Sequence, residues 1–415
     1  MRVAILTPYF PPEMGAPPAR LYEIAVRLKS YGHEMTVITA FPNRPHGKVY
    51  EGYRGKFRMV EDMDGIRVIR TWIKPSASSA SFFGRTINDL SFTWSSGWST
   101  ARLLGDQDVL LVQNPPLFSG YSAKHLKKKT GAKMVMWCGD VWPDVLLQSG
   151  QLKPGRMANF MRRLQRYCFR HSDLVAVTNP KIAEDVRDAY DCKAVAVWSN
   201  GVDTNLFRPE LRDTELRRQF GAGEGDILVG YIGLHGRFQG IDAIIDAADR
   251  LKERKNIKFI FIGEGVEKPR LEAMVRDKKL ENIVFHASKP KSEIPAILAS
   301  CDISSITLLT RMPGTMPSKF YEALSAGAIP IVAEACEASV LVKKHNTGKI
   351  YEPMDGESFA NAVIDVAEMS PQQRQEMRDN GRGLAMRFDR DKLAAFVNET
   401  IEALVADQPL PEVDW

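Results

Sequence analysis

The chain of 415 residues has few cysteines, no long apolar run and little net charge, and each shortage excludes a class of protein. Its five cysteines are scattered, odd in number and free of CxxC spacing, which argues against a disulfide framework or a zinc site and for a reducing compartment. Because no run of about eighteen apolar residues exists, no transmembrane helix is predicted. Residues 1–6 are too short an apolar run for a signal peptide, so we expect a cytoplasmic protein.

The net charge of +5 is small for this length. It permits contact with a nucleotide or an anionic surface but does not by itself indicate nucleic-acid binding, and we expect no nucleic-acid partner. A chain of this length is long for one hydrophobic core and fits two domains of about 200 residues each.

Residues 317–333, PSKFYEALSAGAIPIVA, predict a short helix, a tight stop and a buried strand. Thr315, Pro317 and Ser318 suit the cap and first turn of the helix. Gly327 is the residue type that most readily ends a helix in a left-handed conformation. The apolar run that follows is typical of a strand covered on both faces.

The predicted helix has two faces of different character. Phe320, Ala323 and Leu324 fall on one side and should pack. Lys319 and Glu322, three residues apart, share another side next to a helix N-terminus that favours anions.

A cation and a carboxylate at this place suit a nucleoside diphosphate. Lys319 and the free N–H groups of Gly314, Thr315 and Met316 would bind phosphate, and Glu322 would accept from the ribose hydroxyls. The alternative is an ordinary surface helix with an ion pair.

Strand and helix patterns alternate through both halves of the chain. Strands are expected at residues 3–6, 35–39, 68–71, 109–112, 133–137 and 174–178, and again at 227–232, 259–262 and 283–285. Helices are expected at 19–31, 242–252 and 268–278, and three amphipathic helices from residue 356 to the end. The pattern predicts an α/β chain with two doubly wound, Rossmann-like domains facing a ligand cleft, and a hinge near residues 199–203.

A glycine-rich loop, GLHGRFQG at residues 233–240, sits between a strand and a helix. Gly236 and its neighbours would let backbone N–H groups approach phosphate, and Arg237 would donate two hydrogen bonds. Gly263 and Gly265 flank a similar loop. The alternative is a turn with a solvent-facing arginine, and the spacing is wrong for a GxGxxG dinucleotide site.

Three further residues are candidates with open alternatives. Gly15 could let the N-terminal backbone approach the diphosphate, or belong to a flexible Pro-rich turn. Asn200 could make a polar contact in the cleft, although we favour a left-handed turn. Asp140 follows an apolar strand, so its carboxylate could point into the cleft, or it could cap a helix.

Asp62-Met63-Asp64 has a DxD spacing that can bind a metal, but it precedes Gly65 and a strand, which favours a hairpin turn. No other His, Cys or Asp cluster has ligand spacing, so we expect no metal and no cofactor.

An aromatic stretch falls largely on one face of a predicted helix, and a run of three lysines, residues 127–129, follows later in the same domain. Its residues are Phe82, Phe83, Ile87, Leu90, Trp94 and Trp98. It could rest on the headgroups of an anionic membrane as a peripheral contact, or it could be a core helix.

The 317–333 stretch resembles the nucleotide-binding signature of glycosyltransferase family 4, whose members have the two-domain GT-B fold and transfer sugars with retention. Four further motifs match one subgroup, the bacterial surface-polysaccharide transferases of O-antigen and colanic-acid type, some of which are N-acetylfucosamine transferases. These are FPPE at residues 10–13, GHEMTV at 32–37, DVWP at 140–143 and NGVD at 200–203.

The resemblance implies an acceptor-binding domain over residues 1–200, a nucleotide-sugar-binding domain over 201–390 and a C-terminal helix over 391–415 that crosses back to the first domain. It implies a hexosyltransferase that moves a sugar, such as N-acetylfucosamine, from a UDP-linked donor to a lipid-diphosphate-linked acceptor in O-antigen or lipopolysaccharide biosynthesis. The alternatives are a GT-B nucleotide-sugar epimerase and a nucleotide-sugar-binding protein without turnover.

Three positions depart from the family pattern. The arginine and lysine usual in the glycine-rich loop are replaced by Leu234 and Gln239, so the diphosphate charge must rest on Arg237 and Lys319. These two residues are expected to be catalytic, together with Asp140, which could orient the acceptor hydroxyl or touch the donor sugar. The second glutamate usual in the family is replaced by Gly314.

Overall fold

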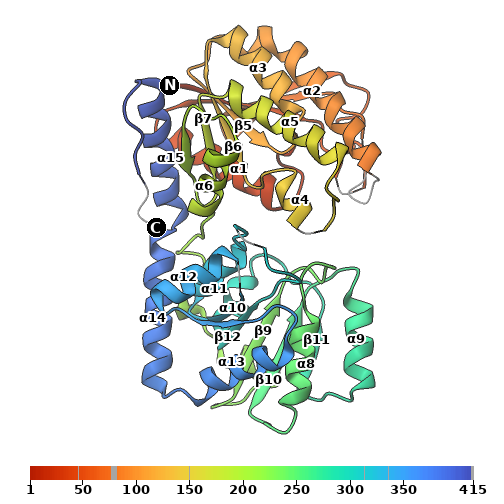
Figure 1. The fold of residues 1–415 in the computed structure, drawn as a ribbon, viewed down its shortest axis with the longest axis vertical. Helices are drawn as coiled ribbons and strands as arrows, with labels where there is room; N and C mark the ends of the chain where they lie inside the picture. Colours follow the sequence, from red (N-terminus) through yellow and green to blue (C-terminus); the bar gives the residue numbers. More distant parts are fainter. Residues whose placement is uncertain (45, 76–81, 149, 313, 335, 413–415) are drawn as a thin grey trace. The chain divides into compact units, whose positions relative to one another are not determined.

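The computed structural model describes residues 1–44, 46–75, 82–148, 150–312, 314–334 and 336–412. Contacts within the chain divide it into two compact units, shown in Figure 1. Unit 1 comprises Met1–Ser199 and Ala394–Trp415, and unit 2 comprises Asn200–Leu393. Each unit is built on a parallel sheet with helices around it, which is the predicted fold class.

Unit 1 contains an eight-stranded sheet in the order β3-β4-β2-β1-β5-β6-β7-β8, parallel except for β3, which runs antiparallel to β4. The strands are β1 (Arg2–Leu6), β2 (Glu34–Ala40), β3 (Arg58–Met63), β4 (Ile66–Thr71), β5 (Val109–Asn114), β6 (Lys133–Cys138), β7 (Leu174–Val177) and β8 (Val195–Val197).

Helices cover both faces of this sheet, because alternate residues of its strands face opposite sides. The helices are α1 (Ala16–Ser30), α2 (Phe82–Leu104), α3 (Ser119–Thr130), α4 (Asp144–Gln148), α5 (Arg156–His171), α6 (Pro180–Ala189) and most of α15 (Arg390–Val405). Ala4 and Leu6 pack on the side of α2, α3, α5 and α6. Val3 and Ile5 pack on the side of α1 and α15.

Unit 2 contains a six-stranded sheet in the order β11-β10-β9-β12-β13-β14, parallel throughout. Its strands are β9 (Ile227–Ile232), β10 (Ile257–Ile262), β11 (Ile283–His286), β12 (Ile303–Ile306), β13 (Ile329–Ala333) and β14 (Lys349–Tyr351). Its helices are η1 (Pro209–Leu211), α7 (Thr214–Gln219), α8 (Asp242–Arg250), α9 (Lys268–Asp277), α10 (Ile294–Ser300), α11 (Ser318–Ala326), α12 (Glu337–His345), α13 (Gly356–Glu368) and α14 (Pro371–Arg387).

A buried carboxylate ties together the strands that carry the candidate site. Asp302 precedes β12 and accepts from the Leu228 N–H of β9 over 2.9 Å. Arg212, Arg217 and Arg378 also bind it, over 2.7, 2.8 and 3.0 Å. Burial raises the pKa of the Asp302 carboxyl, but the guanidinium groups and the backbone bond outweigh it and hold the pKa below its usual range.

Several predicted elements are confirmed, with shifted ends. Helix α1 begins at residue 16 rather than 19, because Pro17 and Pro18 sit in its first turn, where proline is tolerated. The predicted hairpin at Asp62–Asp64 is confirmed: β3 and β4 pair antiparallel, and the Asp62 carboxylate accepts from the Gly65 N–H. None of the described helices has the length and apolar character that crossing a membrane requires.

Candidate active site

In unit 2 the strand order reverses between β9 and β12, which are neighbours in the sheet although β10 and β11 separate them along the chain. Ligands of open α/β sheets bind beyond the carboxyl ends of the strands at such a reversal. Here β9 leads into residues 233–240, and β12 leads into residues 307–317 at the start of α11. The Leu309 N–H donates to the Phe238 carbonyl over 3.1 Å and joins the two segments. The glycine-rich loop and the predicted nucleotide-binding helix therefore lie at one edge of the sheet.

The loop after β10 lies directly on the glycine-rich loop. Gly263 has a φ of +151°, and a Cβ there would lie 1.9 Å from the Gly233 carbonyl oxygen. A Cβ on Gly265 would lie 2.2 Å from the His235 carbonyl oxygen. Gly263 and Gly265 are thus required for the packing of the two loops, whereas a Cβ on Gly236 would meet only side chains at 3.2 Å or more.

Lys319, in the first turn of α11, reaches back over the end of β9. Its Nζ lies 4.4 Å from the centre of the Tyr231 ring, a cation–π distance. A Cβ on Gly233 would lie only 2.4 Å from this Nζ, so the glycine makes room for the ammonium group. Burial lowers the pKa of Lys319 to about 8, although the carboxylate of Glu322 raises it.

Glu322 follows one turn later on the same helix. Burial raises the pKa of its carboxyl, while Arg390, Lys319 and Lys291 lower it. Burial thus disfavours the charged forms of both Lys319 and Glu322. This suits a site in which a bound ligand, in place of water, interacts with the two charges. The opposite face, with Phe320, is buried, as predicted.

The N-terminus of α11 differs from the prediction. Pro317 is the N-cap residue and Ser318 begins the first turn, as predicted, but no side chain of the described residues caps the helix, so a capping role for Thr315 is wrong. The Thr315 N–H donates to the Met312 carbonyl over 3.1 Å, so the expectation that it is free for phosphate is also wrong.

Gly314 and Met316, the other predicted phosphate-contacting residues of this loop, are buried. Gly314 has a φ of +77°, in the left-handed region that favours glycine. A glutamate here would strain the backbone, so the glycine is tied to the conformation of this loop.

Arg237 lies in the glycine-rich loop itself, and its side chain is turned to solvent. Its side chain is 75% exposed, and its Nε lies 3.7 Å from Glu267 Oε1 at the start of α9. Such an exposed ion pair contributes about 0–1 kcal/mol, so it is easily exchanged for a bound anion.

His235 belongs to this site and was missed by the sequence reasoning. Its ring is fully buried, and neither ring nitrogen has a hydrogen-bond partner among the described residues. Burial, followed by the charges of Lys268 and Lys319, lowers its pKa to about 4, so it is neutral near pH 7. The only feature of the sequence that could have indicated His235 is its position between the glycines of a predicted phosphate-binding loop.

In unit 1, Asp140 follows β6 and faces Arg20 of α1. Burial lowers the pKa of Arg20 and raises that of Asp140, and each group offsets part of the shift of the other. The Arg20 guanidinium also lies 4.8 Å from the centre of the Trp137 ring. Asp140 precedes α4 by four residues, too far to be its N-cap. Arg20 carried no signal in the sequence, since its partner is far along the chain.

The other two candidates lie where a helix or a unit begins. Gly15 is the N-cap residue of α1 and has a φ of +140°. Asn200 begins unit 2. Asn200 is not among the described non-glycine residues with positive φ, so the left-handed turn expected there is wrong. Two residues later, Val202 forms a β-bridge with Asp389.

The predicted aromatic helix is α2, and four of its residues, Ile87, Leu90, Trp94 and Trp98, are exposed. The core alternative is therefore wrong for these four. The side chains of Phe82 and Phe83 lie outside the described residues.

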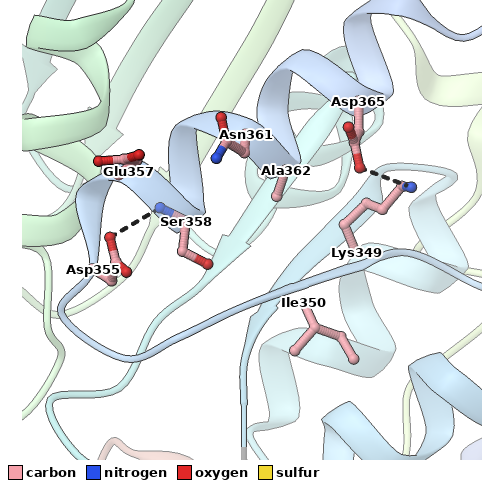
Figure 2. A pocket seen from close by; sticks show the side chains of 8 residues that line it. All are labelled: Lys349, Ile350, Asp355, Glu357, Ser358, Asn361, Ala362 and Asp365. Atoms are coloured by element: carbon pink, nitrogen blue, oxygen red, sulfur yellow. Dashed lines mark hydrogen bonds and ion pairs between the residues drawn. The ribbon is translucent and has the colours of Figure 1, made fainter.

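A groove of about 340 Å³ lies between β14 and α13, away from the β9–β12 edge (Figure 2). Its charged groups are already used: Lys349 pairs with Asp365 over 3.2 Å, and Asp355 accepts from the Ser358 N–H over 2.9 Å. We assign it no ligand. Among the described residues no group of three or more His, Cys, Asp or Glu is placed to hold a metal, and metal independence stays a prediction.

Residues 212–384 match the family described as "Glycosyl transferases group 1", and residues 15–201 match the "Glycosyl transferase 4-like domain". The Escherichia coli protein WcaI, whose name assigns it to glycosyl transfer in colanic acid biosynthesis, is 25% identical over 346 residues, which cover 81% of this chain and 84% of WcaI.

Two solved structures have similar folds. Sucrose-phosphate synthase of Thermosynechococcus elongatus gives a TM-score of 0.78 at 14% identity and covers 98% of this chain and 100% of its own. HepE of Anabaena, in complex with UDP, gives 0.72 at 16% identity, with coverage of 97% and 100%. These likenesses confirm the expected GT-B fold class.

Proposed function

Since the chain is a glycosyltransferase of the GT-B type, with a 4-like domain over residues 15–201 and a group 1 domain over 212–384, we propose that it transfers a sugar from a nucleotide diphosphate donor held by unit 2. The observation that carries the proposal is the pair Lys319 and Glu322 at the β9–β12 edge, where the fold places ligands.

Each residue of the site has one task in this proposal. Glu322 accepts from the ribose hydroxyls, and Lys319 and Arg237 bind the diphosphate. When the bond between the anomeric carbon and the diphosphate oxygen breaks, the leaving oxygen gains negative charge, which these cations and the start of α11 stabilise without a metal. The acceptor hydroxyl oxygen forms the new bond to the anomeric carbon with retention of configuration, and its proton passes to the released diphosphate.

The proposal for the donor and the acceptor rests on the similar proteins and on the residue at position 314. The likeness to HepE, solved with UDP, favours a uridine nucleotide. Glycine at position 314 removes a carboxylate that would accept from sugar hydroxyls, which favours an N-acetylated 6-deoxyhexose. The likeness to WcaI, named for colanic acid biosynthesis, favours an acceptor that belongs to a surface polysaccharide such as O-antigen, and the motif resemblance adds a lipid diphosphate as the carrier of that acceptor.

Unit 1 would bind the acceptor. Asp140 would accept from the acceptor hydroxyl, and Arg20 would hold the carboxylate charged and in place. Gly15, at the start of α1, would present backbone N–H groups to an anionic group.

A thermal-shift panel of UDP-, GDP-, dTDP- and CMP-sugars tests the donor, because a ligand that binds the folded state raises the Tm. The best donor is then incubated with a lipid-diphosphate sugar and the product analysed. We expect a transferred sugar and free UDP. A new sugar isomer formed from the donor alone would indicate an epimerase, and donor binding without release of UDP with any acceptor would indicate a binding protein.

A further inference from the structure

The positive charge of the chain is concentrated on three neighbouring helices of unit 1, α2, α3 and α5 (Figure 1). They contain eleven Lys and Arg residues and one acidic residue, Asp89. The +10 on these helices exceeds the +5 of the whole chain, so all other residues together carry −5. Such an asymmetry is typical of a surface that meets a polyanion.

These cations face outward. Ten of the eleven are exposed, and the other, Lys127, is half-buried and pairs with Asp173 over 2.5 Å. Arg162 pairs with Asp144 over 3.0 Å. The exposed residues are Arg85, Arg102, Lys124, Lys128, Lys129, Arg156, Arg162, Arg163, Arg166 and Arg170.

Large apolar side chains are exposed among the cations. Trp98 is 61% exposed and Trp94 52%, which are unusual values for tryptophan in a protein that packs its core normally. Each of the three helices contributes exposed apolar or aromatic residues, namely Ile87, Leu90, Trp94 and Trp98 on α2, Tyr121 on α3, and Met157 and Phe160 on α5.

Aromatic contacts connect these residues into one surface. Trp94 meets the exposed Phe57 and Trp72 beside the β3–β4 hairpin, with ring centres 5.8 and 6.5 Å apart. Trp98 stacks on His125 of α3, with ring centres 5.2 Å apart.

The surface continues from α3 to α5. Tyr121 lies against Tyr167 of α5, with ring centres 4.6 Å apart, and the Lys124 ammonium lies 5.2 Å from the centre of the Tyr167 ring. We name the outward side of α2, α3 and α5, together with Phe57 and Trp72, the aromatic–basic surface.

We propose that the aromatic–basic surface docks this chain on the surface of an anionic phospholipid bilayer. Tryptophan and tyrosine favour the headgroup region, where the ring is buried and its N–H or O–H remains hydrated, while lysine and arginine bind anionic headgroups. Exposed Leu90, Ile87 and Met157 favour a bilayer over a phosphate backbone, because the boundary between headgroups and acyl chains accommodates aliphatic side chains. The assignment rests on the proposed function in one respect, since a lipid-linked acceptor would be presented at such a surface.

Vesicle flotation tests the proposal with the full chain. We expect binding to vesicles of phosphatidylglycerol and phosphatidylcholine and little binding to phosphatidylcholine alone. Binding should weaken as salt rises from about 0.1 M to 1 M, because the Debye length falls from about 10 to 3 Å.

A pair of matched variants tests the role of charge. Lys128→Gln/Arg163→Gln removes two exposed cations from the surface, and because each cation strengthens binding roughly fivefold, vesicle affinity should fall roughly thirtyfold. The control Lys255→Gln/Arg276→Gln removes the same charge from exposed positions of unit 2 and should bind as the wild type. Equal loss in both variants would overturn the proposal.

A second pair tests the aromatic residues. Trp94→Ser/Trp98→Ser should release the protein from vesicles and keep its Tm within a few degrees, whereas Val26→Ser/Tyr31→Ser on α1 should still bind. If Trp94→Ser/Trp98→Ser unfolds, the comparison of Lys128→Gln/Arg163→Gln with its control decides whether this surface binds vesicles.

UDP binding, measured by calorimetry on the same samples, separates this proposal from the proposed function. Absence of vesicle binding with UDP binding intact would overturn only the docking surface. Absence of UDP binding with vesicle binding intact would overturn only the proposed function. Tighter binding to an RNA oligonucleotide than to anionic vesicles, lost in Lys128→Gln/Arg163→Gln, would identify a nucleic-acid surface and refute the lipid assignment.

Discussion

Lys319 is the residue through which pH should control donor binding. Its ammonium must be protonated to bind a diphosphate, but burial lowers its pKa from 10.5 to about 8. About nine-tenths of molecules then carry the charge at pH 7 and about one-tenth at pH 9, so affinity should be roughly tenfold weaker at pH 9. A nucleotide sugar is the suitable ligand, since both of its phosphates are esterified and neither titrates in this range.

Calorimetric titration of the wild type and two Lys319 variants at pH 7, 8 and 9 tests how donor affinity depends on pH. The wild type should lose affinity above pH 8. Lys319→Arg keeps its charge and should show no such loss, and Lys319→Met should bind weakly at every pH. The same tenfold decline in Lys319→Met would show that another group titrates and would refute the reasoning.

The stability of the ligand-free protein should change with pH in the opposite direction: it should increase as the pH rises, whereas donor affinity decreases. The folded-state pKa of Lys319 lies below the unfolded value, so the unfolded chain binds more protons between about pH 8 and 10. The free energy of unfolding of the wild type, measured relative to Lys319→Met in urea, should therefore rise over this window. A relative stability that falls instead would contradict the assigned pKa.

Four further predictions concern the donor site. Glu322→Ala should cost about 2–3 kcal/mol of nucleotide binding by calorimetry, roughly 30- to 150-fold, because a carboxylate accepting two hydroxyls is lost; unchanged affinity in the folded variant would disprove the ribose contact. Arg237→Gln should lower turnover about a hundredfold, whereas Glu267→Gln, which frees the arginine from its ion pair, should not, and wild-type rates in Arg237→Gln would exclude the arginine from the reaction. Activity should survive EDTA, and a loss restored by Mn²⁺ would show that a metal is needed. Because residue 314 is glycine, a nucleotide-linked N-acetylated 6-deoxyhexose should outcompete UDP-glucose, and preference for UDP-glucose in a side-by-side assay would overturn that inference.

Local patterns predicted much of the fold. The stretch around Gly327 is an example: this residue ends α11 with a φ of +79°, and the predicted strand after it is buried throughout. By contrast, β12 was missed, because Ser304 and Ser305 interrupt its apolar run although both are buried in the sheet. Whether this strand is buried depends on the strands and helices that cover it, and the residues of the segment alone do not reveal those neighbours.

The candidate site was predicted only where its parts are close in sequence. Lys319 and Glu322 share a helix, and their common face follows from the helical period. The approach of Gly263 to the Gly233 carbonyl joins segments thirty residues apart, and Arg20 faces Asp140 from a helix in a distant part of the chain. Such pairings depend on the sheet order, which strand patterns alone do not fix.

The central claim is that unit 2 binds the nucleotide at α11, with phosphate at Lys319 and ribose at Glu322. The most direct test is a comparison of UDP and uridine affinities in the wild type, Lys319→Met and Glu322→Ala. We predict that both variants bind UDP more weakly, and that only Glu322→Ala loses affinity for uridine, since uridine has no phosphate for Lys319 to bind. Wild-type affinity for UDP in both variants would contradict the account.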